Sequence, residues 1–254
     1  MSDKTFICLL VLFLAVTGGK SDVTFNFENN CLDNVWLSSS PSDGDLDPES
    51  GPGTLEIFDM PDPWTGSIWA RTKCSANDSN YFSCETGDCR SGNLSCQGPQ
   101  PTFPVTLLNF DIKQNVVSYE VSLVHGHNIA VRIQPDGGSL VGGSGPCPVV
   151  DCIQDISNVC PAPLVAKNEN GAYVGCNSAC DVLKDCNPNQ YTQAFKQLCN
   201  LAHIFPGDST PPLYKCSGAA VLGKITIANP MLETTFENYP KGKLLSRSLR
   251  LVQV

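Results

Sequence analysis

The sequence predicts a mainly β protein that is rich in turns and cross-linked by disulfides. Apolar and polar residues alternate along Val23–Phe27 and Val117–Leu123, as they do in half-buried strands. The 21 glycines and 19 prolines indicate many turns between short strands. The 14 cysteines indicate that disulfides hold the long loops. We therefore expect one large all-β domain, alone or with appendages.

The N-terminal segment is typical of a secretory signal. A short charged start precedes an apolar run of 11 residues, Phe6–Val16, and small residues follow it. Such a run is too short to cross a bilayer, which takes about 20 residues, but it suits a signal peptide. A buried N-terminal helix is the alternative. We expect residues 1–21 to be cleaved off, which leaves an odd number of cysteines in an oxidising compartment.

Strand patterns follow one another along the first third of the chain. Alternating apolar residues and a turn at Asn29-Asn30 predict a β-hairpin over Val23–Leu37. Residues 38–53 are rich in Ser, Pro, Asp and Gly, and they predict a loop. Two further strands are predicted at Thr54–Met60 and Ser67–Thr72.

The middle of the chain alternates between irregular and strand-like segments. Residues 73–104 lose the periodicity and contain four cysteines, so we expect a disulfide-held excursion there. Strand character returns at Val105–Ile112. A second strand is predicted over Val116–Ile133, where apolar and polar residues alternate from Val117 to Leu123.

A helix is predicted within the cysteine-rich segment 147–199. Apolar residues at helical spacing predict it over Asn189–Leu198, and Asn187 or Asn189 offers an N-cap. Lys224–Ile227 is the last predicted strand. The tail of residues 231–254 has no strong periodicity, so we expect it to be loosely held.

The net charge of −9 excludes some classes of partner. The 16 lysines and arginines, against 25 acidic residues, form no basic cluster, so the chain lacks the electrostatic footprint of a nucleic-acid-binding protein. Anionic membrane surfaces would repel it. No second apolar stretch reaches the length of a transmembrane helix, so we expect an exported protein without an integral membrane segment.

Three groups of cysteine-containing strings carry a family resemblance. They are Asn29-Asn30-Cys31 with Val35-Trp36, Ile68-Trp69-Ala70-Arg71-Thr72-Lys73-Cys74 with Glu85-Thr86-Gly87-Asp88-Cys89, and Asn177-Ser178-Ala179-Cys180 with Tyr191–Cys199. On these residues the chain resembles the plant thaumatin-like proteins of the pathogenesis-related type, as a divergent member, over about residues 23–230. The resemblance implies a flattened antiparallel β-sandwich with a helical disulfide-rich lobe and a small disulfide-rich loop lobe.

The same resemblance implies the domain organisation. The thaumatin-like domain would span residues 22–230, between the signal and the tail of residues 231–254. Within that domain, the resemblance assigns segments to three parts of the fold. The core sandwich takes residues 22–71, 107–153 and 200–230, the loop lobe takes 72–106, and the helical lobe takes 154–199.

Six disulfides follow from the family's pairing when it is carried over by position. They are Cys74–Cys84, Cys89–Cys96, Cys147–Cys216, Cys152–Cys199, Cys160–Cys176 and Cys180–Cys186. The last pair is new, because the Cys-Cys dipeptide that would bind both partners in the family is missing here. Cys31 is left over, since Ala228 stands where its family partner would be. Cys31 is then a buried inert thiol, a reactive thiol or half of an intermolecular disulfide.

The family's proposed working part is an acidic cleft lined by one arginine, one glutamate and three aspartates. Those positions correspond, in that order, to Ser67, Asn109, Glu120, His125 and Asp208. Glu120 and Asp208 could act as the carboxylate pair of a glycosidase, with His125 as a proton carrier. Because only two of the family's four acids remain, the clustering that would raise one carboxyl pKa is weaker, which favours binding over catalysis.

Other candidate sites are few. Asn77 and Asn93 lie in Asn-X-Ser strings and are candidate glycosylation sites. His125-Gly126-His127 could bring two imidazoles together, but no third ligand is nearby in the sequence and Cys-X-X-Cys pairs are absent. We therefore expect no metal site and no cofactor. The glycine-rich segment 137–145 lacks the lysine of a phosphate loop and the frame of a nucleophile elbow, so it predicts turns.

The resemblance implies a non-enzymatic, secreted defence or cell-wall protein of the apoplast that acts against fungi. Its partner would be a β-glucan-like polysaccharide bound in the cleft, and the molecule would be a monomer. A weak endo-β-1,3-glucanase that uses Glu120 and Asp208 is one alternative. A protease or amylase inhibitor, with a protein target in place of the polysaccharide, is the other.

Overall fold

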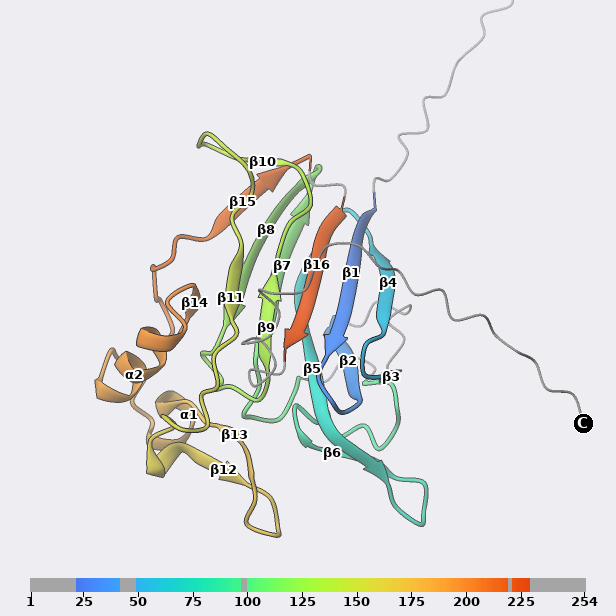
Figure 1. Cartoon of the computed structure of the whole chain (residues 1–254), viewed down its shortest axis with the longest axis vertical. Helices are drawn as coiled ribbons and strands as arrows, with labels where there is room; N and C mark the ends of the chain where they lie inside the picture. The colour runs from blue at the N-terminus through green and yellow to red at the C-terminus, as the bar shows by residue number, and fades with distance from the viewer. Residues whose placement is uncertain (1–21, 42–48, 97–99, 219–220, 229–254) are drawn as a thin grey trace, which may run out of the picture.

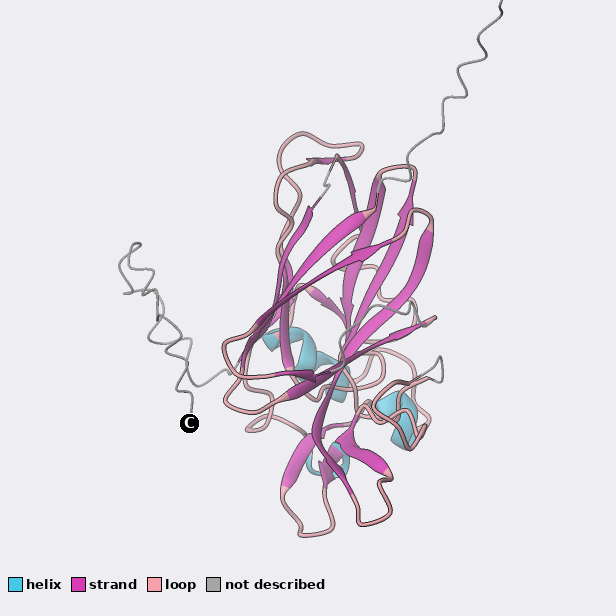
Figure 2. Cartoon of the chain, turned by 90° about the vertical axis from the view of Figure 1, so that its right-hand side faces the viewer, coloured by secondary structure: helices cyan, strands magenta, loops and turns pink. Residues whose placement is uncertain are grey.

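Two β-sheets packed face to face form the body of the molecule (Figure 1) (Figure 2). The computed structural model describes residues 22–41, 49–96, 100–218 and 221–228. The predicted signal (1–21) and the predicted tail (231–254) lie outside the described residues. Among the helices of the described part, none is long and apolar enough to cross a membrane. The mainly β fold class predicted from the sequence is confirmed.

The smaller sheet joins the two ends of the domain. It consists of β1 (Val23–Asn30), β4 (Leu55–Met60), β9 (Ala130–Ile133), β11 (Val150–Cys152) and β16 (Val221–Ala228). Their order is β11-β9-β16-β1-β4. β1 pairs with β16 in parallel and with β4 antiparallel, so the first and last described strands are neighbours inside the sheet (Figure 1).

The larger sheet has nine strands within the described residues. They are β2 (Val35–Ser40), β3 (Glu49–Ser50), β5 (Trp64–Ala76), β6 (Phe82–Thr86), β7 (Leu107–Lys113), β8 (Val116–Ser122), β10 (Ser139–Leu140), β14 (Ala202–His203) and β15 (Tyr214–Ser217). The main order is β10-β15-β8-β7-β5-β2-β3, with β14 beside β8 and β6 beside β5. The sandwich is antiparallel, as expected, except for the parallel pairs β1–β16 and β14–β8.

Apolar side chains from both sheets fill the space between them. Along β1 every second residue is buried, which is the alternation visible in the sequence. The ring of Phe25 stacks on Phe58 of β4, with ring centroids 5.5 Å apart, and meets Phe110 of β7 edge-on at 4.9 Å. Because Phe110 belongs to the other sheet, these contacts join the two layers.

The predicted hairpin over Val23–Leu37 is wrong, because β1 and β2 belong to different sheets. The buried side chain of Asn29 holds the corner between them. Its Nδ2 donates to the carbonyls of Asp33 and Ser50 at 3.0 and 2.8 Å, and its Oδ1 accepts from the backbone N–H of Cys31 at 2.9 Å. These bonds stabilise an open corner that leads to the second sheet, whereas a two-residue turn would return the chain to the first.

Two further segments differ from the prediction. The strand predicted over Val116–Ile133 is two strands, since β8 ends at Ser122 and β9 begins at Ala130 in the other sheet. The excursion predicted for residues 73–104 begins as a hairpin, because β5 continues to Ala76 and pairs with β6. This hairpin projects beyond the sandwich (Figure 1). The remaining predicted strands overlap β4, β5, β7 and β16.

Helices and a small sheet flank one end of the sandwich (Figure 1). The elements are a 3₁₀ turn (Ala162–Leu164), β12 (Val165–Lys167) paired with β13 (Tyr173–Cys176), α1 (Ala179–Leu183) and α2 (Gln190–Leu198). α2 is the helix predicted from the sequence. Asn189 caps it, because its Oδ1 accepts from the N–H groups of Tyr191 and Thr192 at 2.9 and 3.0 Å.

Disulfides cross-link both flanks of the sandwich. Six are present in the described residues, and they are the six pairs that the resemblance implied. Cys31 is the free cysteine of the described part, and β16 ends at Ala228, whose register partner on β1 is Asn30. Cys31 therefore directly follows Asn30, the residue that pairs with Ala228. Ala228 is the alanine that stands where the family has the partner of this cysteine.

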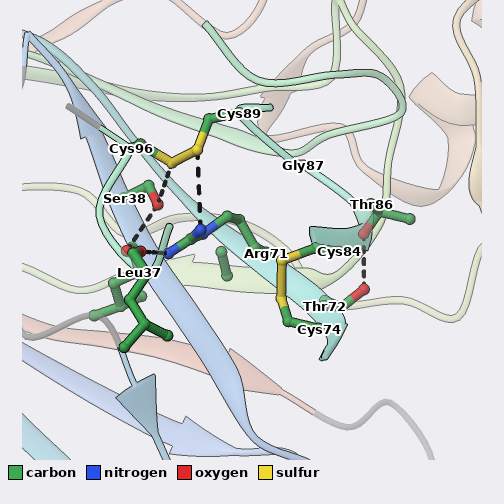
Figure 3. The surroundings of a disulfide bond; sticks show 12 residues. Leu37, Ser38, Arg71, Thr72, Cys74, Cys84, Thr86, Gly87, Cys89 and Cys96 are labelled. Atoms are coloured by element: carbon green, nitrogen blue, oxygen red, sulfur yellow. Dashed lines mark hydrogen bonds between the residues drawn. A yellow bond between two sulfur atoms is a disulfide. The ribbon is translucent and has the colours of Figure 1, made fainter. Parts of the chain in front are cut away.

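A buried arginine braces the disulfide-rich loop (Figure 3). Arg71 of β5 is fully buried, and its guanidinium donates to Sγ of Cys89 at 3.9 Å and to the carbonyl of Leu94. Its Cζ lies 5.3 Å from the centroid of the Phe82 ring. Burial lowers the pKa of Arg71 to about 10, against a raising effect of Asp88, so the guanidinium stays charged. One side chain therefore ties β5, β6 and the loop together.

Candidate functional site

A row of polar side chains crosses three neighbouring strands of the larger sheet. Ser67 of β5 lies opposite Asn109 of β7, and Asn109 lies opposite Glu120 of β8. Directly opposite residues have Cβ atoms about 5 Å apart, so their side chains meet. The Ser67 hydroxyl donates to Oδ1 of Asn109 at 2.6 Å, and Nδ2 of Asn109 donates to Oε1 of Glu120 at 2.7 Å. We call these three residues, together with His203, the polar row.

His203, on β14, extends the row, and the sequence analysis missed it. Its Nδ1 lies 2.5 Å from Oε2 of Glu120, and its Nε2 lies 2.7 Å from the carbonyl oxygen of Pro211. Both partners are acceptors, so both ring nitrogens donate and the imidazole carries a positive charge. The hydrogen bond to Glu120 raises the pKa of His203, although burial opposes it. The structure therefore contains a Glu120–His203 ion pair.

Asp208 lies close enough to act electrostatically on Glu120, but its oxygens are bonded elsewhere. Nζ of Lys196, from α2, lies 2.8 Å from Oδ2 of Asp208. The backbone N–H of Ile204 donates to the same oxygen at 3.0 Å, and the backbone N–H of Thr210 donates to Oδ1 at 3.1 Å. Asp208 thus holds α2 against the segment after β14, and Lys196 is a second residue that the sequence analysis missed.

Neither carboxyl group of the candidate glycosidase pair, Glu120 and Asp208, keeps its proton. Burial raises the pKa of Glu120, but hydrogen bonds from His203 and Asn109 outweigh it, and the pKa lies below its ordinary value. Burial also raises the pKa of Asp208, and the bonds from Lys196 and the backbone again outweigh it. Both groups are therefore ionised, and each faces a cation.

His125 makes a separate cluster with partners of its own. Its Nδ1 lies 3.2 Å from Oδ2 of Asp181, and its ring stacks on Phe103 with centroids 4.1 Å apart and an interplanar angle of 6°. No hydrogen bond or ring contact among the described residues joins it to Glu120 or Asp208. Of the five expected cleft positions, the structure joins Ser67, Asn109 and Glu120 directly, and Asp208 lies nearby.

The two predicted glycosylation sites lie on the surface. Asn77 and Asn93 are both exposed, as glycosylation requires. The described residues contain no group of three or more His, Cys, Asp or Glu side chains placed to hold an ion.

The fold and the site together define the class of protein. It is a disulfide-rich β-sandwich protein in which both carboxylates of the site, Glu120 and Asp208, are paired with cations. The chain belongs to the thaumatin family, whose model matches residues 29–227. Thaumatin-like protein 1a of Malus domestica is 32% identical over 243 residues, which cover 86% of this chain and 96% of that protein. A Prunus avium protein named glucan endo-1,3-beta-glucosidase is 32% identical over 240 residues, with 85% and 95% covered.

The similarity to solved structures is weaker than the similarity to these plant sequences. The thaumatin-like xylanase inhibitor TLXI has a TM-score of 0.45 and 20% sequence identity, over 81% of this chain and 99% of that chain. The family assignment rests on the family model and on the plant relatives, which are similar along almost their whole length.

Proposed function

We propose that this protein is a secreted, defence-related thaumatin-like protein whose polar row binds a β-glucan-like polysaccharide without strong catalysis. The observation that carries the proposal is the pairing of both acids with cations, Glu120 with His203 and Asp208 with Lys196. A glycosidase needs one carboxyl group that keeps its proton, whereas both of these pKa values lie below their ordinary range. Hydroxyl, amide and carboxylate groups in one row offer both donors and acceptors to sugar hydroxyls.

Two features support export to the apoplast or cell wall. Six disulfides suit an oxidising compartment, in which they persist. The apolar N-terminal run has the length of a signal peptide. We propose that the mature molecule acts there as a monomer against fungal walls.

A retention experiment on insoluble β-1,3-glucan tests the binding. We expect folded wild-type protein to be retained and Asn109→Ala to bind about tenfold more weakly, because it removes the link between Ser67 and Glu120. Asn170→Ala is the matched control, since Asn170 is exposed and lies outside the polar row. Wild-type protein that passes through the glucan unretained contradicts the proposal.

A weak endo-β-1,3-glucanase is the second candidate, because the Prunus avium relative carries that enzyme's name. It requires that Glu120→Gln and Asp208→Asn each abolish the release of reducing sugar from a laminarin-type substrate. We expect no release by the wild-type protein above the level of the buffer. If the wild-type protein releases reducing sugar and both variants do not, the protein is a glucanase, and the proposal of binding without catalysis is wrong.

A further inference from the structure

The smaller sheet has an unpaired edge at β4 (Figure 1). β4 pairs with β1 on one side, and no described strand pairs with it on the other. The opposite edge strand, β11, has only three residues, whereas β4 has six. A long edge strand presents its outer backbone N–H and C=O groups to any extended segment that reaches it.

The side chains of β4 combine exposed apolar groups with acids. Leu55 is 54% exposed and Ile57 is 64% exposed, on the face of the strand opposite to the buried ring of Phe58. Glu56 and Asp59 belong to the same strand, and neither forms an ion pair with a described residue. This edge therefore suits a strand that carries both apolar and basic side chains.

The sequence of the tail supplies such a strand, outside the described residues. Residues 238–254 contain four basic side chains and no acidic one, in a chain whose net charge is −9. The tail as a whole has no strong periodicity, but Arg247, Leu249 and Leu251 occupy alternate positions. In a strand these three side chains would share one face, with Arg250 on the other.

We propose that residues 247–251 pair with β4 of the same molecule as an additional antiparallel strand of the smaller sheet. Directly opposite side chains then meet as apolar pairs on the exposed face and as pairs of opposite charge, and both kinds stabilise neighbouring strands. The opposite pairs are Leu249 with Ile57, Leu251 with Leu55, Arg247 with Asp59, and Arg250 with Glu56.

One antiparallel alignment satisfies the apolar and the charged pairs together. A slide of two residues in one direction places Ile57 opposite Arg247, and a slide of two in the other places Asp59 opposite Leu249. A slide of one residue exchanges the two faces of the added strand. The sequence of the two segments therefore specifies the register as well as the partner.

Two other arrangements satisfy the edge less well. A parallel alignment that joins both acids to the two arginines places serines opposite Leu55 and Ile57. Pairing with β4 of a second copy supplies no cation, since Leu55–Met60 contains no basic residue, and it brings acids to both sides of the edge. We therefore assign the edge to the tail of the same chain.

The intervening chain is long enough to reach. β16 ends at Ala228, level with Asn30 of β1, whereas Asp59 is level with Thr24 near the other end of β1. The path from Ala228 to the position opposite Asp59 is about 25 Å, at about 4.8 Å per strand spacing and 3.4 Å per residue. The 18 residues 229–246 can span up to about 60 Å.

Disulfide trapping in the mature protein tests the register. Ile57→Cys with Leu249→Cys, in a Cys31→Ala background that removes the free thiol, should form an intramolecular disulfide in a glutathione buffer. Ile57→Cys with Ser248→Cys is the control, because Ser248 would lie on the opposite face, and it should cross-link at least about fivefold more slowly. Peptide mass spectrometry measures both rates. Equal rates, or disulfides mainly between molecules, overturn the proposal.

Amide hydrogen exchange supplies a test without added cysteines. In the wild-type protein, residues 247–251 should exchange at least about tenfold more slowly than residues 238–243 of the same tail, because only the first group is paired. Uniformly fast exchange along the tail would overturn the proposal.

A charge reversal tests the partner of Arg247. Asp59→Lys should speed the exchange of residues 247–251 about two- to fivefold, and Asp59→Lys with Arg247→Asp should restore it. Asp136→Lys is the matched control, since Asp136 is exposed and lies outside β4, and it should leave the exchange unchanged. Equal effects of the two lysine variants, or no rescue in the double variant, would mean that the tail does not pair with β4 in this register.

Discussion

The Glu120–His203 ion pair makes the free energy of unfolding depend on pH. The raised pKa of His203 gives stabilisation that is fully present below its ordinary value of 6.5 and is lost as pH rises through the folded-state value. The lowered pKa of Glu120 gives stabilisation that is present above its ordinary value of 4.5 and is lost as pH falls through the folded-state value. The pair therefore contributes most between these two values.

Glu120→Gln should reduce the free energy of unfolding by about 1–3 kcal/mol near pH 5.5, because it removes a hydrogen bond between charged groups. The reduction should shrink above the folded-state pKa of His203. Denaturant unfolding at mildly acidic and alkaline pH measures both values. Glu169→Gln is the control, since Glu169 is exposed. A loss that does not change with pH would show that the ion pair is not its cause.

His127 has the opposite effect on the pH dependence. The folded protein keeps this ring neutral down to a pKa of about 4, whereas the unfolded chain takes up the proton near 6.5. Stability should therefore fall by about 3 kcal/mol as pH drops between these values. His127→Gln should remove this part of the acid destabilisation, which unfolding curves measured across the interval would reveal. An unchanged slope would contradict the neutral, buried state of the ring.

The site residues differ in how far the sequence could reveal them. The family resemblance predicts Ser67, Asn109 and Glu120 by position, and the structure places them opposite one another on β5, β7 and β8. His203 gave no local signal, since its partner Glu120 is 83 residues away and the two meet only through the pairing of β14 with β8. The resemblance places His125 in the same cleft by position, whereas its ring contacts Asp181 and Phe103 in the structure.

At the scale of elements, alternation identified strands but not their sheets. Apolar residues at every second position predict β1 and β8, and the strands predicted at Thr54–Met60 and Ser67–Thr72 overlap β4 and β5. Asn29-Asn30 predicts a turn after β1, whereas the open corner that forms there depends on the bond from Asn29 to Ser50, which is distant in sequence. The pattern over Val116–Ile133 predicts one strand, since both sheets bury alternate residues and the alternation does not record a change of sheet.

The disulfides should contribute unequally, according to the length of chain that each encloses. Cys147–Cys216 closes a separation of 69 residues and Cys180–Cys186 one of six. In the chain-entropy model, removing the first by double alanine substitution should cost about 4 kcal/mol, and removing the second about 2 kcal/mol. Denaturant unfolding of the two variants checks the order. A reversed order would mean that folded-state contacts, rather than loop closure, dominate.

For the whole molecule, the missing bridge should be restorable. Ala228→Cys should pair with Cys31, which lies next to its register partner Asn30, and the bridge would span nearly the entire domain. The chain-entropy model gives a gain of about 5 kcal/mol, an upper value for an engineered bridge. Thiol titration of the denatured mature protein should find about one free sulfhydryl in the wild type and none in the variant. Two free sulfhydryls in the variant would contradict the expected geometry.

The place of β16 has a consequence for how the protein is made. This strand leaves the ribosome after every other described strand, yet it lies between β9 and β1 in the smaller sheet. Until residues 221–228 emerge, the sheet is two halves with unpaired edges, and unpaired edges invite association with other chains. The cell must therefore protect this nascent chain through almost its whole synthesis, and a product terminated before β16 would be an aggregation hazard rather than a smaller working protein.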